Sequence, residues 1–538
     1  MRKAKWHVLF ICLAVSASIL LAGCGSNNQP VAQEQGEATT QEKILTISWG
    51  QDMGELNPHM YSPNQMFAQD MVYESLVRYG EDGEIQPKLA EDWEISPDGK
   101  EYTFKLRKDV KFSDGSSFNA AIAKKNFDVV LSNAERHNWL ELINQIEATE
   151  VVEEYTLKLV FKNPYYPALQ ELALIRPLRF LGEAGFPDNG NTAEGIKQAI
   201  GTGPWVFSEE VKGEYAVFTK NEHYWGAEPK VDKIVIKIIP DAETRAMAFE
   251  KKEIDLIYGS GLISLDSFKQ FRDSGKYKTD ISNPLATRFL AINSNKGATK
   301  ELEVRRAIQH AFDKQTFIDA VFYGTEKKAD TLFASNFPYC DLGLEAYDYN
   351  LEKASLLLEE AGWKKGEGKE FREKNGQLLE MEFNFDSDDA IQKSIGEVLQ
   401  GDLKKAGIKL NLVGEETASY AQRQKDGNFN LIYESNWGAP YDPHSFVSSM
   451  RTPAHADYQA QIGLPMKSEI DAKITEVLLS TNEEERQELY AYILETLHEQ
   501  AVYLPISYRS NIAVHHDYVS GVVFFGTQYE MPLANIDL

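Results

Sequence analysis

The second half of the chain alternates helical and strand-like hydrophobic patterns, and this order constrains the fold most. One set of apolar residues recurs at helical spacing: Val304, Ala307, Ile308, Ala311 and Phe312. Asn350 can cap another helix, which is expected to run to Leu358. A later set alternates as in a half-buried strand: Leu379, Met381, Phe383 and Phe385. Because a helix at 390–405 and a strand at 408–413 should follow, this half predicts an α/β lobe.

The first half shows the same mixture of patterns. Strands are expected at 44–49 and 102–106. The β-branched run at 234–239 is typical of a buried strand, Pro240 should end it, and 244–250 fits the helix that follows. The chain as a whole therefore predicts an α/β protein.

The cysteines exclude a disulfide framework. Cys12 and Cys24 lie in or directly after the N-terminal leader sequence described below. The rest of the chain therefore has one cysteine, Cys340, which is expected to be a small buried side chain. A body of roughly 500 residues can be held by its own apolar interior, but it is too long for a single core. At least two lobes are expected.

The N-terminus has the parts of a secretory leader. Arg2, Lys3 and Lys5 precede an uncharged apolar run that is too short to span a bilayer. The leader ends in Leu-Ala-Gly before Cys24, which resembles a bacterial lipobox whose cysteine becomes acylated. An ordinary secretory signal with a chance cysteine is the alternative. Residues 1–23 are thus expected to be a signal peptide, and the polar segment 24–43 a flexible lipid-anchored tether.

The charge and the absent motifs narrow the function. The formal net charge of -26 disfavours binding to nucleic acid and to anionic lipid. The sequence contains no GxSxG motif, no phosphate-binding loop and no dinucleotide fingerprint. We therefore expect a protein that is not an enzyme and has no prosthetic group.

Several segments, in order along the body, resemble family 5 of the extracellular solute-binding proteins, the dipeptide/oligopeptide/nickel class. The matching stretches are Leu89-Ala90-Glu91-Asp92-Trp93, Ser96-Pro97-Asp98-Gly99, Gly203-Pro204-Trp205, Tyr224-Trp225-Gly226, Val304-Arg305-Arg306-Ala307 and Glu360-Ala361-Gly362-Trp363. The resemblance implies an α/β fold of the class II, cluster C kind, in which two lobes close as a clamshell and lobe one carries an extra subdomain. It places lobe one at 44–285, lobe two at 286–508, and a return to lobe one at 509–538.

Within this class, other stretches are similar to the nickel-binding receptors of nickel ABC importers. They are Leu56-Asn57-Pro58-His59, Arg136-His137-Asn138-Trp139, Leu174-Ile175-Arg176-Pro177, Trp437-Gly438-Ala439-Pro440-Tyr441 and Met450-Arg451-Thr452-Pro453-Ala454-His455. The resemblance implies a monomer, lipid-anchored at the outer face of the cell membrane, that captures nickel as a chelate with free histidine. The permease and ATPase subunits of an ABC importer would be its partners.

The same resemblance implies roles for individual residues. His455 would be the one protein ligand to nickel, since imidazole suits this metal; alternatively, it caps the loop after Pro453. Arg136 and Arg176 would bind the carboxylates of the chelator through their planar guanidinium groups; alternatively, each pairs with a structural carboxylate. The walls of the pocket would be formed by Tyr61, Met66, Trp139, Trp437 and Tyr441.

One departure and two rival functions remain open. The family has a tyrosine where this chain has Ala421, so Tyr420 could reach the ligand or not. A receptor for another metallophore, such as an opine-type chelate of nickel, cobalt or zinc, could use the same arginines without His455. A peptide receptor of the same fold would not need His455 together with both arginines.

Overall fold

The computed structural model describes residues 42–61, 65–81 and 83–538. The expected signal peptide and Cys24 lie outside the described residues. Residues Glu42–Leu538 form one compact unit. Within the described ranges, no helix combines the length and the apolar character needed to cross a bilayer.

The first sheet begins at the start of the described chain. Its strand order is β1 (Ile44–Trp49), β10 (Lys233–Ile238), β9 (Tyr215–Lys220) and β8 (Trp205–Val211). β1 runs parallel to β10, with Ile44 opposite Lys233 and Trp49 opposite Ile238. Ile234 and Ile236 are fully buried, whereas Val235 and Ile238 are half-buried, so the β-branched run forms the predicted strand but only one of its faces is fully buried. Helix α5 (Ala242–Glu250) follows, as expected.

An antiparallel sheet occupies the segment between β1 and β8. It consists of β4 (Ala90–Ile95), β5 (Glu101–Leu106), β7 (Thr156–Phe161) and β6 (Ile146–Glu153). Tyr102, Phe104 and Leu106 are buried, as their alternation predicts. Helix α2 (Ala120–Ser132) packs against β6 and β7. This sheet is the extra subdomain that the family resemblance implies.

The C-terminal segment returns to the first half of the chain. Strand β21 (Ile512–His515) lies between β11 (Leu256–Tyr258) and β12 (Lys278–Ile281), antiparallel to both. Val514 is opposite both Ile257 and Thr279. Residues far apart in the sequence thus complete one small sheet, and the chain crosses from the second half back to the first directly after β20 (Tyr503–Arg509).

The second half is built on a six-stranded sheet. Its order is β14 (Lys327–Lys328), β20, β13 (Ala286–Ile292), β19 (Leu431–Ser435), β17 (Glu380–Asp386) and β18 (Lys409–Glu415). β17 is parallel to its two neighbours, whereas β13 is antiparallel to β19 and β20. Asn375 and Gly376 both have positive φ in the turn between β15 (Glu373–Lys374) and β16 (Gln377–Leu378), which confirms the predicted turn.

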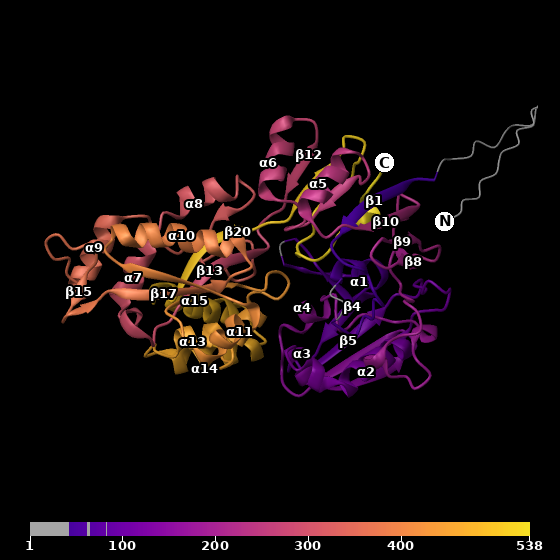
Figure 1. The fold of residues 1–538 in the computed structure, drawn as a ribbon. Coiled ribbons are helices and arrows are strands. Elements are labelled where there is room, and N and C mark those ends of the chain that lie inside the picture. Colours follow the sequence, from indigo (N-terminus) through magenta and orange to yellow (C-terminus); the bar gives the residue numbers. More distant parts are fainter. Residues whose placement is uncertain (1–41, 62–64, 82) are drawn as a thin grey trace, which may run out of the picture. The chain divides into compact units, whose positions relative to one another are not determined.

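Helices cover both faces of this sheet (Figure 1). On one side lie α7 (Leu302–Ala311), α8 (Lys314–Val321), α9 (Leu351–Glu360) and α10 (Ala390–Lys405). On the other side lie α11 (Thr417–Asp426), α13 (Ala456–Gln461), α14 (Lys467–Leu479) and α15 (Glu483–Glu499). The predicted cap of α9 is confirmed, because the Asn350 side chain accepts the Lys353 N–H at 2.9 Å.

The two-sided covering corrects one expectation. The alternation in β17 predicts a half-buried strand, and Met381, Phe383 and Phe385 are indeed buried. Asn384, on the opposite face, is fully buried too, because helices cover that face as well. Its amide nitrogen donates to Glu415 Oε2 at 3.3 Å, whereas its Oδ1 has no hydrogen-bond partner among the described residues.

Candidate ligand-binding site

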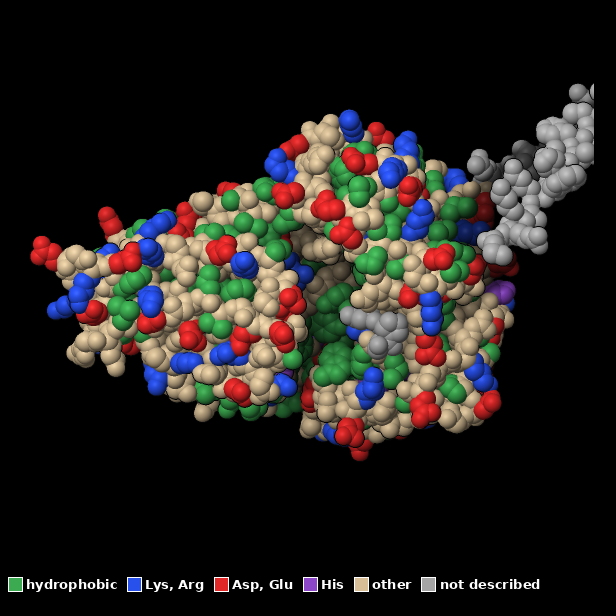
Figure 2. Space-filling view, in the orientation of Figure 1, with side chains coloured by type: hydrophobic (Ala, Val, Ile, Leu, Met, Phe, Trp, Pro, Cys, Tyr) green, Lys and Arg blue, Asp and Glu red, His purple; other side chains and the backbone are tan. Residues whose placement is uncertain are grey.

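A cavity of about 1160 Å³ is lined by residues from the first half, the second half and the C-terminal return. Figure 2 shows a hollow with hydrophobic side chains near the centre of the face in view, whereas acidic and basic side chains are interspersed around it. The volume slightly exceeds the usual range for small-molecule pockets, which is about 300–1000 Å³. The cavity therefore has room for a ligand larger than a bare ion.

Tyr61 is the centre of an aromatic group on one wall. The Trp139 indole N–H donates to the Tyr61 hydroxyl at 2.9 Å, and the two rings meet edge to face at 5.8 Å. The same hydroxyl lies 2.5 Å from His137 Nδ1. Burial raises the pKa of Tyr61 to about 12 and lowers the pKa of His137 to about 4, so both groups are neutral near pH 7. The contacts hold Tyr61 in one orientation.

Two arginines lie over the ring of Tyr61. The guanidinium carbons of Arg176 and Arg136 are 5.1 and 5.9 Å from its centroid. Arg176 follows α4 (Ala168–Leu172), lines the cavity and donates to the Tyr61 carbonyl at 3.1 Å. Arg136 is exposed in the short helix η1 (Ala134–His137) and, among the described residues, is not part of the cavity lining. Of these two arginines, only Arg176 therefore lines the cavity.

Trp437 and Tyr441 form an opposite aromatic wall, directly after β19. Their rings are 6.4 Å apart, and Tyr441 lies 6.2 Å from the ring of Trp139. The turn between them needs Gly438, whose φ is +77° and where an added Cβ would come within 2.5 Å of the Leu285 carbonyl oxygen. Aromatic rings from both halves of the chain thus face one cavity.

His455 is the N-cap residue of α13, but its side chain makes no capping hydrogen bond. Its backbone N–H donates to the Thr452 carbonyl at 3.0 Å, and the ring of Trp437 lies 6.3 Å from the imidazole. In the part of the chain that the structure describes, nothing hydrogen-bonds this imidazole. Burial lowers the pKa of His455, which favours the neutral form that can coordinate a metal.

Of the residues predicted for the site, the cavity lining contains Tyr61, Met66, Trp139, Arg176, Trp437, Tyr441 and His455. Tyr420 lies elsewhere: it is buried on α11, and its hydroxyl donates to the Tyr433 carbonyl. The structure therefore gives Tyr420 a role in packing, while contact of the other residues with a ligand stays a prediction.

The lining also includes residues that sequence reasoning missed. These are Glu171, Arg451, Arg509, Gln528 and Tyr529, among others. Arg451 lies in the Met-Arg-Thr-Pro stretch that is similar to the nickel-binding receptors, so its place in the site could have been predicted from the sequence. Arg509, Gln528 and Tyr529 had no such signal, because only the crossing of the chain after β20 brings them to the cavity.

His515 and His516, the adjacent pair near the C-terminus, make structural contacts. His515 Nε2 lies 3.1 Å from Asp280 Oδ2, and His516 Nε2 lies 3.0 Å from the Phe249 carbonyl oxygen. Among the described residues, no three His, Cys, Asp or Glu side chains gather as a metal cluster. Cys340 is buried, as predicted.

A family model described as "Bacterial extracellular solute-binding proteins, family 5 Middle" matches residues 84–458, more than half of the chain. The chain belongs to this family. The two-lobed family 5 fold and the sequence resemblance are thereby confirmed, and the family 5 relatives are solute-binding proteins.

The relatives differ in how similar they are to this family 5 chain. The nickel-binding periplasmic protein of Escherichia coli (strain K12) is 49% identical over 493 residues, which cover 91% of this chain and 94% of that protein. The dipeptide-binding protein of the same strain is 26% identical over 501 residues, with 88% and 90% covered. The structure of NikA from Brucella suis, in complex with Fe(III)-EDTA, has a TM-score of 0.89 at 54% identity and covers 92% of this chain and 99% of its own.

Proposed function

We propose that this protein is a lipid-anchored, extracytoplasmic receptor of an ABC importer, and that it captures nickel as a small-molecule chelate. The observation that carries the proposal is the His455 imidazole, which has no hydrogen-bond partner among the described residues and lies in a cavity that also holds Arg176. The 49% identity to a nickel-binding periplasmic protein supports the same cargo.

The side chains around the cavity divide the task of recognition. His455 supplies one nitrogen ligand to nickel, and the chelator, free histidine in our proposal, supplies the others. Arg176 binds a chelator carboxylate, and Arg136 reaches the same ligand from the rim over the ring of Tyr61. Trp139, Trp437 and Tyr441 line the cavity with aromatic rings, and a ligand packed against them is shielded from water, which strengthens these charged hydrogen bonds.

Bare nickel should bind weakly. The described part of the chain offers no cluster of three or more His, Cys, Asp or Glu side chains. A single imidazole leaves most coordination positions of the ion to water or to another ligand. Recognition of a preformed chelate explains why the cavity combines one possible metal ligand with arginine and aromatic side chains.

A receptor for a larger metallophore is the second candidate. It is favoured by the cavity volume of about 1160 Å³, which exceeds what a chelate of one amino acid fills. An opine-type chelator could occupy every coordination position and make His455 dispensable.

We also propose that the boundaries between the two lobes lie near residues 285 and 508. The lobes would close about these two chain crossings when the ligand binds.

Isothermal titration calorimetry on the purified protein separates these candidates. We would titrate it with nickel chloride, with nickel plus excess histidine, with histidine alone and with a mixture of di- and tripeptides. Heat from nickel–histidine that greatly exceeds the heat from either component alone is the expected result. If the peptides bind and nickel–histidine does not, the proposed function is wrong.

A further inference from the structure

Arg509 is a charged residue of the cavity that lacks an acidic partner. It is the last residue of β20, and its Nη1 reaches the Ser435 hydroxyl at 3.4 Å, a long contact. Its Nε is buried without a hydrogen-bond partner, and no carboxylate within the described ranges forms an ion pair with it. A half-buried guanidinium left in this state is costly unless an anion binds it.

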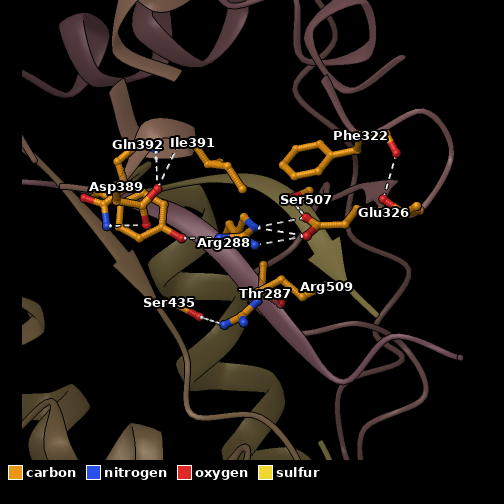
Figure 3. A network of polar contacts seen from close by, with 12 residues as sticks. Thr287, Arg288, Phe322, Glu326, Asp389, Ile391, Gln392, Ser435, Ser507 and Arg509 are labelled. Atoms are coloured by element: carbon orange, nitrogen blue, oxygen red, sulfur yellow. Dashed lines mark hydrogen bonds and ion pairs between the residues drawn. The ribbon is translucent and has the colours of Figure 1, made fainter. Parts of the chain in front are cut away.

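A neighbouring arginine of the same sheet, Arg288, has the acidic partner that Arg509 lacks. Arg288, on the adjacent strand β13, makes three hydrogen bonds to Glu326 at 3.1–3.2 Å and one to the Tyr433 hydroxyl at 2.8 Å. In Figure 3, Arg288 points to Glu326, whereas Arg509 reaches Ser435 alone among the residues drawn. The sheet thus neutralises one arginine and presents the other to the cavity.

The C-terminal return places further polar groups beside Arg509. The Gln528 side chain donates to the Trp437 carbonyl at 2.5 Å, and the Asn511 side chain donates to the Gln528 carbonyl at 3.1 Å. These two hydrogen bonds fix the segment around Gln528. The adjacent Tyr529 lines the cavity. Burial raises the pKa of Tyr529, while Arg509 and Arg176 both act to lower it. The phenol therefore lies within electrostatic reach of both arginines.

The charges of the lining favour an anion. Three arginines line the cavity, Arg176, Arg451 and Arg509, against two carboxylates, Glu141 and Glu171. This positive excess is placed in a chain whose formal net charge is -26. Electrostatics of this kind select and steer a negatively charged ligand into the cavity.

We propose that Arg509, with Ser435, Gln528 and Tyr529 around it, is a second carboxylate subsite, separate from the one at Arg176. The subsite rests on the proposed function, because it specifies the chelate: a nickel complex with at least two carboxylates, one for each arginine, which requires two histidine molecules on the metal or one chelator with several carboxylates. The planar fork of Arg509 provides two parallel N–H donors for such a group. A chelate with a single carboxylate fills only one of the two subsites.

The test compares two nickel chelates that differ in their carboxylates. Nickel–nitrilotriacetate presents three carboxylates, and nickel–histamine presents none. Calorimetry gives the dissociation constants of both, and of nickel–histidine, for the wild type, Arg509→Gln, Arg509→Lys and the charge-matched control Arg306→Gln. Arg306 lies on α7 and donates to the Glu499 carbonyl, away from the cavity lining. Circular dichroism and thermal melting confirm that each variant is folded.

We expect Arg509→Gln to weaken binding of nickel–nitrilotriacetate by roughly ten- to a hundred-fold relative to nickel–histamine, since one charged hydrogen-bond pair is lost. Arg509→Lys should lose less, because it keeps the charge but not the fork, and Arg306→Gln should match the wild type. An unchanged preference in both Arg509 variants, with nickel–histidine still bound by the wild type, overturns the subsite alone. Failure of the wild type to bind any of the three chelates overturns the subsite and the proposed function together.

Discussion

Glu171 and Ser445 meet in the lining of the cavity: the Ser445 hydroxyl donates to Glu171 Oε1 at 3.3 Å, although 274 positions separate the two residues in the sequence. The same oxygen accepts the Tyr165 hydroxyl at 2.8 Å, and Oε2 accepts the Leu142 N–H at 2.9 Å. Only 2% of Glu171 is exposed. This carboxylate therefore connects helix α4 of the first half to helix α12 (His444–Ser449) of the second half.

Replacing Glu171 by Gln should destabilise the protein. The two Glu171 oxygens now accept hydrogen bonds from Leu142, Tyr165 and Ser445. In the Gln variant an NH2 group replaces one of these oxygens, so at least one buried donor loses its acceptor. We expect the free energy of unfolding to fall by about 1–3 kcal/mol, measured from urea unfolding followed by tryptophan fluorescence. Ser445→Ala removes one long hydrogen bond and should cost less. Equal stability of the wild type and Glu171→Gln would contradict this role.

Replacing His455 by Ala should weaken nickel–histidine binding. If the imidazole is the one protein ligand, its loss should cost at least about ten-fold in affinity, since even indirect partners of a metal are worth that much. His223→Ala, on an exposed position outside the cavity lining, is the matched control. Calorimetry with nickel–histidine provides the measurement. Unchanged affinity in His455→Ala would favour a metallophore that fills every coordination position.

The two arginines over Tyr61 should differ in importance. Arg176 lines the cavity and is partly buried, so Arg176→Ala should weaken nickel–histidine binding by roughly ten-fold or more. Arg136 is exposed, and water competes for its hydrogen bonds, so Arg136→Ala should cost a few-fold. Parallel titrations of both variants test this order. The reverse order would mean that the rim closes over the ligand and buries Arg136.

The proposed lipid anchor on Cys24 predicts how the protein fractionates. Replacing Cys24 by Ser should abolish acylation, and the protein should then move from the membrane fraction to the soluble fraction. Membranes separated by ultracentrifugation, with mass spectrometry of the N-terminal peptide, provide the measurement. Cys340→Ser is the matched control, since this buried cysteine should not affect the anchor. A Cys24→Ser protein that stays in the membrane fraction would exclude this cysteine as the anchor.

The fold was predictable where a local pattern decides the structure. The strand formed by the β-branched run at 234–239, the cap at Asn350 and the turn at Asn375-Gly376 each depend on neighbouring residues, and each element was predicted correctly. Burial of Asn384 was not predicted, because it depends on helices from distant parts of the chain covering the second face of the sheet.

The site shows the same division between local and distant information. Trp437 and His455 stand in stretches that carry the family resemblance, and both line the cavity. Arg509 ends an apolar strand and carries no motif. Its place at the cavity depends on its pairing opposite Ala286 and on the return of Gln528 and Tyr529 from the C-terminus. Only the three-dimensional arrangement shows that its guanidinium lacks a carboxylate.

The buried Asp442 should make stability depend on pH. Only 1% of it is exposed, its Oδ2 accepts the Gly438 N–H at 2.6 Å, and its Oδ1 has no partner among the described residues. Burial raises the pKa of Asp442 from 3.8 to about 8. Because the folded pKa is the higher one, the folded state keeps the proton where the unfolded state has lost it. Stability from this group is complete below pH 4 and is lost as the pH rises to 8.

The Asp442→Asn variant tests this dependence. Within the window from pH 4 to 8, ionisation can cost the wild type up to about 1.4 kcal/mol per pH unit, and the amide cannot ionise. The unfolding free energy of the variant, relative to the wild type, should therefore be higher at pH 8 than at pH 5. Urea midpoints at both values measure it, with the exposed Asp388→Asn as control. A difference that is the same at both pH values would show that Asp442 ionises alike in the folded and unfolded chain.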